Sequence, residues 1–85
     1  MNAELMLRQA ASVVADRRAA YGDPSSSMDL IARRWSITLG RPVSPAQVAL
    51  CLIDLKLARL AHDPSHFDSM VDVAGYAAVL REVTR

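Results

Sequence analysis

Apolar and polar positions follow a helical period along most of this chain, and three breaks divide the pattern into four segments. Between the breaks, hydrophobic residues recur three and four positions apart, which is the spacing of one face of an α-helix. The pattern predicts four helices, at residues 3–21, 26–39, 45–62 and 66–83. Such helices, without strand-like alternation between them, predict a compact all-α four-helix fold and a single domain over residues 1–85.

Each break carries residues that end one helix or begin the next. Ser44 precedes a proline and stands three residues before Gln47, which is the spacing of a capping box. Ser65 has a similar spacing to Asp68, so we expect Ser65 to cap the fourth helix. The serines at 25–27 are expected to form a loop and the cap of the second helix.

The third segment differs from the others because apolar residues surround the expected helix on every side. These residues are Val48, Leu50, Cys51, Leu52, Ile53, Leu55, Leu57 and Leu60. A helix that is apolar all round is buried on all sides, so we expect Cys51 in the core. Because 52% of the chain is hydrophobic, more than a small monomer readily buries, we also expect a homo-oligomer.

Two cations, Lys56 and Arg59, interrupt this apolar helix and lie only about 60° apart around its axis. Asp68 and Asp72 follow in the fourth segment, four residues apart and therefore on one side of that helix. Buried charges are costly unless they are paired. The first interpretation is therefore a structural ion network that joins two neighbouring helices and fixes their assembly, with no ligand.

A second interpretation adds Arg17, which also interrupts an apolar helix face. Three cations and two carboxylates in an apolar setting would suit a ligand with phosphate groups. Arginine can donate two parallel hydrogen bonds to phosphate oxygens, and lysine provides a compact positive charge. Tyr76 or Trp35 would then stack on a base, or else serve in packing. The sequence alone leaves both interpretations open.

Composition excludes several other classes of function. The net charge of +1 lacks the basic excess typical of nucleic-acid binding, so no nucleic-acid partner is expected. Cys51 is the single cysteine, which excludes a cysteine zinc site, and His62 and His66 are expected to be solvent or capping residues of a turn. No stretch approaches the roughly 20 apolar residues of a membrane span, and the start lacks a signal peptide, so we expect a cytoplasmic protein without a membrane partner.

Four strings of the sequence resemble a family of small phage and prophage proteins that are similar to the MazG-like all-α nucleotide pyrophosphohydrolases. They are R-x-x-x-Y-G-D-P from Arg17, I-A-x-x-W-S from Ile31, L-K-L-A-R-L from Leu55 and D-S-M-V-D-V-A-G-Y-A-A from Asp68. The resemblance implies a MazG-like helical bundle that is usually oligomeric and has a site for the phosphate tail of a nucleotide. If a phage encodes the chain, the expected location of the protein is the host cytoplasm. The matching positions are Arg17, Tyr21, Lys56, Arg59, Asp68, Asp72 and Tyr76.

The chain departs from the MazG-like pattern in its acidic residues. Those enzymes carry a paired-glutamate motif and a Glu-x-x-Asp motif that hold magnesium, whereas this chain has only Glu4 and Glu82, near its two ends. Asp68 and Asp72 are the candidate Mg²⁺ ligands, and they would take the place of the Glu-x-x-Asp motif. Two functions of a nucleotide site therefore stay open: sequestration of a nucleoside triphosphate or cyclic signalling nucleotide, and Mg²⁺-dependent pyrophosphohydrolysis.

Overall fold

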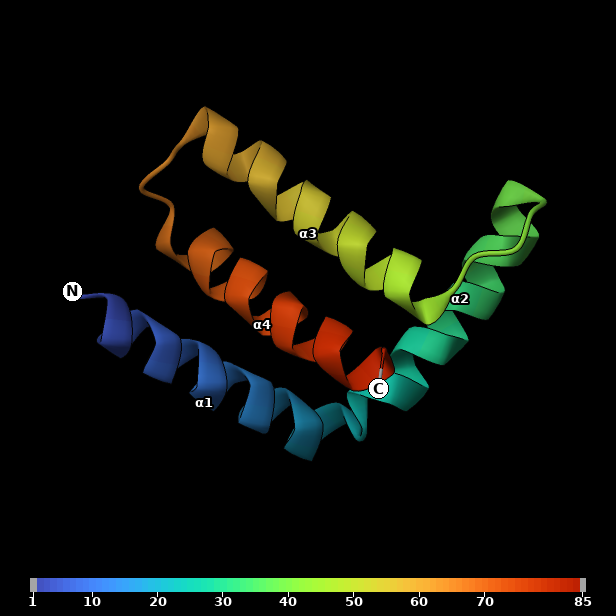
Figure 1. Ribbon diagram of the computed structural model, residues 1–85, viewed down its shortest axis with the longest axis horizontal. Helices are drawn as coiled ribbons and strands as arrows, with labels where there is room; N and C mark the ends of the chain where they lie inside the picture. Colours follow the sequence, from blue (N-terminus) through green and yellow to red (C-terminus); the bar gives the residue numbers. More distant parts are fainter. Residues whose placement is uncertain (1, 85) are drawn as a thin grey trace.

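The computed structural model describes residues 2–84, and these residues form four α-helices joined by short turns (Figure 1). The helices are α1 (Ala3–Tyr21), α2 (Pro24–Leu39), α3 (Pro45–His62) and α4 (Phe67–Val83). The expected all-α fold of four helices is confirmed for this part of the chain. The second helix begins two residues earlier than the sequence predicted, and the fourth begins one residue later.

α4 lies between α1 and α3, and these three helices form one layer (Figure 1). Within the described residues α1 and α3 do not contact each other, whereas α2 crosses one end of the layer and contacts all three other helices. The molecule is consequently flat, with extents of 42 × 30 × 21 Å. A chain folded this way leaves large parts of its outer helices without a neighbour.

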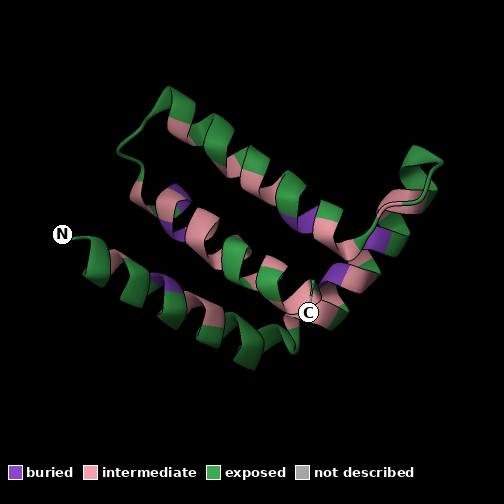
Figure 2. Cartoon of the chain, in the orientation of Figure 1, coloured by how far each residue is buried: buried purple, intermediate pink, exposed green. Residues whose placement is uncertain are grey.

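The core is small and sits where α2 crosses α3. Its buried cluster consists of Met28 and Ala32 from α2 with Val48 and Ala49 from α3. Partly buried side chains from α2, α3 and α4 pack around this cluster, whereas most of α1 and the outer side of α3 are exposed (Figure 2). The helix junction therefore holds the fold together, and α1 is attached mainly through α4.

α2 begins at Pro24 because Asp23 provides the cap that we had assigned to a serine. The Asp23 carboxylate accepts a hydrogen bond of 3.0 Å from the backbone N–H of Ser25, and proline is favoured at the first helical position. The serines at 25–27 therefore lie inside the first turn of the helix rather than in a loop. The expectation of a serine loop was wrong because an aspartate followed by proline already starts the helix.

The cap of α4 is His66 and not Ser65. His66 Nδ1 accepts a hydrogen bond of 3.3 Å from the backbone N–H of Ser69 and lies 2.8 Å from the Ser69 hydroxyl oxygen. Ser65 is engaged in the preceding turn, where its backbone N–H and hydroxyl both donate to the Asp63 carboxylate. Because Asp63 holds Ser65, the next residue along the chain caps the helix.

The burial of α3 also differs from the expectation of a helix surrounded by protein. Only the side of α3 that faces α2 and α4 is buried, while Leu50, Leu55 and Leu57 are each about half exposed and Cys51 is exposed. The prediction that Cys51 lies in the core was wrong for the single chain. The reason is geometric, since α3 stands at the edge of the helical layer and has no neighbour on its outer side.

We predict that Ser44→Ala lowers the free energy of unfolding by about 1 kcal/mol, because it removes one half of the α3 capping box. The Ser44 hydroxyl accepts from the Gln47 N–H at 3.1 Å, and the Gln47 side chain accepts from the Ser44 N–H at 2.9 Å. Urea unfolding measures the change, with the exposed Ser26→Ala as the control. Equal stability of the two variants would contradict a capping role for Ser44.

Candidate functional site

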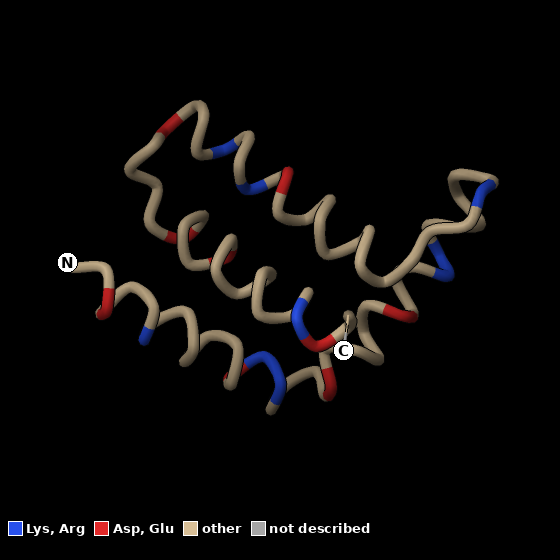
Figure 3. The backbone as a smooth tube through the Cα atoms, viewed as in Figure 1, with Lys and Arg blue, Asp and Glu red and all other residues tan. Residues whose placement is uncertain are grey.

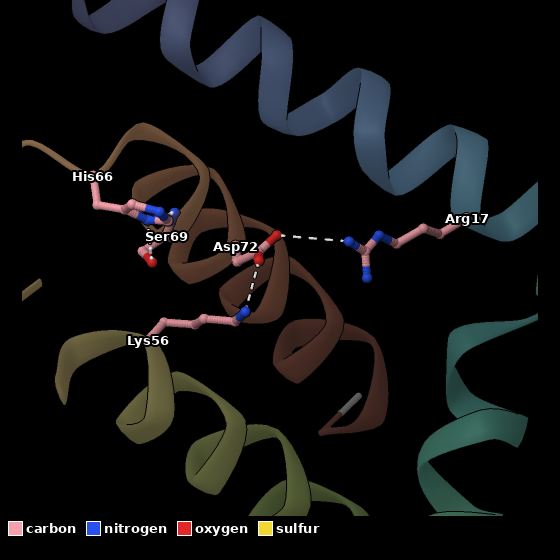
Figure 4. A network of polar contacts seen from close by, with 5 residues as sticks. All are labelled: Arg17, Lys56, His66, Ser69 and Asp72. Atoms are coloured by element: carbon pink, nitrogen blue, oxygen red, sulfur yellow. Dashed lines mark hydrogen bonds and ion pairs between the residues drawn. The ribbon is translucent and has the colours of Figure 1, made fainter. Parts of the chain in front are cut away.

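Asp72 contacts two cations that come from two other helices (Figure 4). Its Oδ2 atom lies 3.0 Å from Nζ of Lys56 on α3, and its Oδ1 atom lies 3.8 Å from Nη2 of Arg17 on α1. Asp72 itself stands near the middle of α4. One carboxylate therefore links all three helices of the layer.

The two ion pairs of Asp72 differ in strength. The side chains of Lys56 and Asp72 are only 13% and 18% exposed, and their distance is that of a charge-assisted hydrogen bond. The Arg17 side chain is 57% exposed, and 3.8 Å is too long for a hydrogen bond. Lys56 is thus closely paired with Asp72, whereas the N–H groups of the Arg17 guanidinium make no hydrogen bond with Asp72.

A cavity of about 340 Å³ opens beside the Arg17–Asp72 pair, between α1, α2 and α4. Its walls are largely apolar and include Val13, Val14, Met28, Ile31, Val71 and, from α3, Leu52. Polar lining comes from Arg17, Arg18, Tyr21, Ser27, Asp72 and Tyr76. A concave apolar space with a few polar groups, at the lower end of the usual volume range, is typical of small-molecule sites.

Gly75 contributes to this cavity because it carries no side chain. A Cβ atom built at Gly75 would meet only Cγ2 of Val14, at an ordinary contact distance of 3.5 Å. The glycine is thus not required for helix packing. Its neighbour Tyr76 is partly buried in the cavity wall, while Tyr21 is 78% exposed at the end of α1.

Arg18 and Glu82 are site residues that sequence reasoning missed. The Arg18 guanidinium donates to a carboxylate oxygen of Glu82 and also lies 3.9 Å from Asp23. This contact fastens the end of α1 to the end of α4 beside the cavity. Figure 3 marks the charged positions along the backbone of these helices. The residues stand 64 positions apart, so no local spacing could have revealed the pair; the available signal was an arginine at the rim of an apolar face.

The structure does not bring Arg59 and Asp68 to this cavity. Arg59 instead lines a second, open cavity of about 480 Å³ at the turn between α3 and α4, together with Leu55, Ala58, His62, Asp63 and His66. Asp68 is exposed and makes no ion pair with Lys56 or Arg59. Of the seven predicted residues, four line the first cavity: Arg17, Tyr21, Asp72 and Tyr76. Lys56 does not line it but pairs with Asp72, Arg59 lines the second cavity, and Asp68 lines neither.

The second cavity carries a negative charge beside Arg59. Ser65 donates to the Asp63 carboxylate from both its hydroxyl and its backbone N–H, and these hydrogen bonds hold the pKa of Asp63 below its ordinary value. Asp63 is therefore ionised wherever an ordinary aspartate would be. Its charge opposes that of Arg59, which makes this cavity a poorer site for an anion than the first.

The carboxylates of the described residues do not fit the magnesium set that the MazG-like resemblance implies. Within residues 2–84 no group of three or more histidine, cysteine, aspartate or glutamate side chains is placed to hold a metal ion. Asp72 directs its oxygens at Lys56 and Arg17, and Asp68 is exposed. Mg²⁺ is held by carboxylates together with waters or substrate phosphates, whereas both oxygens of Asp72 already face cations of the protein.

Comparison with known families gives one match that covers nearly the whole chain. The family described as a domain of unknown function, DUF6378, matches residues 5–84. The chain belongs to the DUF6378 family. The match includes α2, α3, α4, all but the first two residues of α1, and every residue that lines the Asp72 cavity, so this cavity lies within the family domain.

The curated relatives of this DUF6378 domain include two phage proteins. The chain is 36% identical over 80 residues to the Gene 55 protein of Mycobacterium phage L5, covering 92% of this chain and 51% of the phage protein. It is 32% identical over 81 residues to the Gene 55 protein of Mycobacterium phage D29, covering 94% of this chain and 54% of that protein. The chain thus spans about half the length of these relatives, and the expected likeness to phage proteins is confirmed.

No solved structure matches the chain. Among residues 2–84, no helix combines the length and the apolar character that crossing a membrane requires.

We predict that the Lys56–Asp72 pair couples in a double-mutant cycle. Lys56→Met should lower the free energy of unfolding by about 1–2 kcal/mol, because Asp72 then keeps only the loose contact with Arg17. Asp72→Leu should cost a similar amount by leaving Lys56 partly buried and unpaired. The double variant should cost less than the sum, as apolar replacement of a whole pair often does.

Urea unfolding of the four proteins measures this coupling. Arg33→Met is a matched control, because Arg33 is 76% exposed and pairs with Asp29 on its own helix. Strictly additive effects of the two substitutions would show that the pair does not join α3 to α4.

Proposed function

We propose that this domain binds a nucleotide in the Asp72 cavity, with the base against the apolar walls and the phosphate groups at Arg17. The observation that carries this proposal is the state of Arg17. Its guanidinium stands beside an apolar cavity, is more than half exposed, and is oriented by a carboxylate without being hydrogen-bonded to it. Guanidinium groups of this kind provide forked donors for phosphate oxygens.

The charges around Asp72 support an anionic ligand. Lys56 and Arg17 together carry two positive charges, and Asp72 neutralises only one of them. Lys56 is the nearer partner, so the remaining positive charge belongs to Arg17. Arg18 is already paired with Glu82 and would act by holding the wall of the site. A phosphate group at Arg17 would supply the close counter-charge that this arginine lacks.

The remaining lining suits an aromatic ring. Tyr76 lies in the cavity wall and Tyr21 stands near its mouth, where either ring can stack on a base. The absence of a side chain at Gly75 leaves room for a flat group close to α4. Asp72 would accept hydrogen bonds from a sugar or base in addition to orienting Arg17.

Binding without cleavage is the form of this proposal that the site supports best. A MazG-like relationship and Mg²⁺-dependent pyrophosphohydrolysis remain the alternative, which the resemblance of the four sequence strings supports. Against it stands the poor fit of Asp68 and Asp72 to a magnesium site. A binder that keeps its ligand intact would sequester it, and the ligand would be a nucleoside triphosphate or a cyclic signalling nucleotide of a phage host.

The rival from a different class is a structural helical module without a ligand. The Lys56–Asp72 pair favours it, because a largely buried pair between neighbouring helices fixes their register whether or not a ligand binds. The two functions differ in what Arg17 is for. The structural module has little use for this exposed and loosely held side chain.

We predict that a nucleotide stabilises the domain against heat and that Arg17→Met removes this stabilisation. A panel of nucleoside mono- and triphosphates and cyclic di- and trinucleotides, with and without Mg²⁺, serves as the probe. A ligand present at 1,000 times its Kd should add about 4 kcal/mol to the free energy of unfolding. Arg17→Met should keep the unfolding temperature of the free protein, because the Arg17–Asp72 contact is exposed and long.

Arg33→Met is the control and should respond to the ligand as the natural chain does. Chromatography of the ligand after incubation separates the two forms of the proposal: intact ligand means sequestration, and consumed ligand means hydrolysis. No stabilisation by any member of the panel would favour the structural module instead.

We predict that Gly75→Ala changes stability and ligand binding in opposite directions. Alanine in a helix interior is favoured over glycine by up to about 1 kcal/mol, and the new methyl group would meet Val14 without a clash. The same methyl group projects into the cavity and should weaken ligand binding. Urea unfolding and titration calorimetry measure the two effects, and unchanged affinity would place the ligand elsewhere.

A further inference from the structure

We propose that a second copy of this chain packs against the outer side of α3. The starting observation is that the chain exposes too much surface for a monomer of its length. A folded monomer of 85 residues should expose about 5,000 Å². This chain exposes 5867 Å², which is roughly 900 Å² more.

The excess agrees with the area that one subunit contributes to a stable interface. A standard interface covers about 800 Å² on each partner. The buried core is correspondingly small, with six buried hydrophobic residues among those described. A second copy that covers one face would give this flat domain the burial that its own helices do not provide.

The outer side of α3 has the spacing of a helix-pairing surface. We define the outer stripe as the exposed residues Leu50, Cys51, Asp54, Leu57, Ala58 and Ala61. They recur at intervals of three and four residues along about 17 Å of helix, as do the contact positions of paired helices. An outer helix face in a monomer is normally polar, yet Asp54 is the one charged residue in the stripe.

Asp54 determines how two copies can meet. A two-fold axis at Asp54 would bring two carboxylates together, which is unfavourable. An antiparallel arrangement with the axis between Leu50 and Cys51 places each Asp54 opposite Gln47 of the partner subunit, and each Leu57 opposite the first turn of the partner's α3. The Gln47 side-chain oxygen is used in the α3 cap, where it accepts from the Ser44 N–H, so its NH₂ group is free to donate to that carboxylate.

Sedimentation equilibrium of the full chain over a range of concentrations tests this assembly. The natural chain should sediment as a dimer at micromolar concentration. The double variant Leu50→Glu/Leu57→Glu should raise the dissociation constant at least about 100-fold, because it places charges in the stripe on both sides of Asp54. Both leucines are already about half exposed, so the helical circular dichroism of the separated subunits should persist.

Leu7→Glu is the matched control, since Leu7 is 56% exposed on α1 and lies outside the stripe. It should leave the dissociation constant unchanged. A short bis-maleimide should cross-link two Cys51 thiols in the natural chain but not in the double variant, which keeps Cys51. A monomer at all concentrations, or a dimer that persists in the double variant, would overturn the proposal and assign the outer stripe to a different partner.

Discussion

The Lys56–Asp72 ion pair is the interaction on which the geometry of the candidate site depends. It joins α3 to α4 at a point where both side chains have lost most of their contact with water. Since a charge in such a place is costly without a partner, the pair fixes which faces of the two helices meet. The second oxygen of Asp72 is then directed at α1, where it attracts Arg17 across the layer.

The position of α4 explains why the candidate site lies where it does. α4 is the central helix of the layer, and α2 closes one end, so α1, α2 and α4 surround the cavity beside Asp72. Apolar walls and an incompletely paired arginine thus occur together as a consequence of the packing. The same flat arrangement leaves the outer side of α3 uncovered, which links the shape of the domain to its proposed assembly.

Local patterns predicted the helices well because periodicity, glycines and proline-containing caps are local properties of the sequence. The positions of Arg17, Lys56 and Asp72 on their helix faces also predicted that these three side chains would lie close together. The position of Arg59 was not predicted from its helix face. Arg59 lies three residues beyond Lys56, which is about 4.5 Å further along α3, toward the turn and the second cavity. The Arg18–Glu82 contact and the exposure of Cys51 depend on the packing of distant segments, which no local spacing reports.

We propose that the free side of Arg17 and the cavity beside it form the binding site. Nitrogen-15 NMR spectra of the natural chain, recorded during titration with ATP and with cyclic di-AMP, test this proposal. The amide signals of Gly75 and Tyr76 and the Nε–H signal of Arg17 should shift with at least one of these nucleotides. Shifts confined to Arg59 and the turn at residues 63–66, or no shift with either nucleotide, would contradict it.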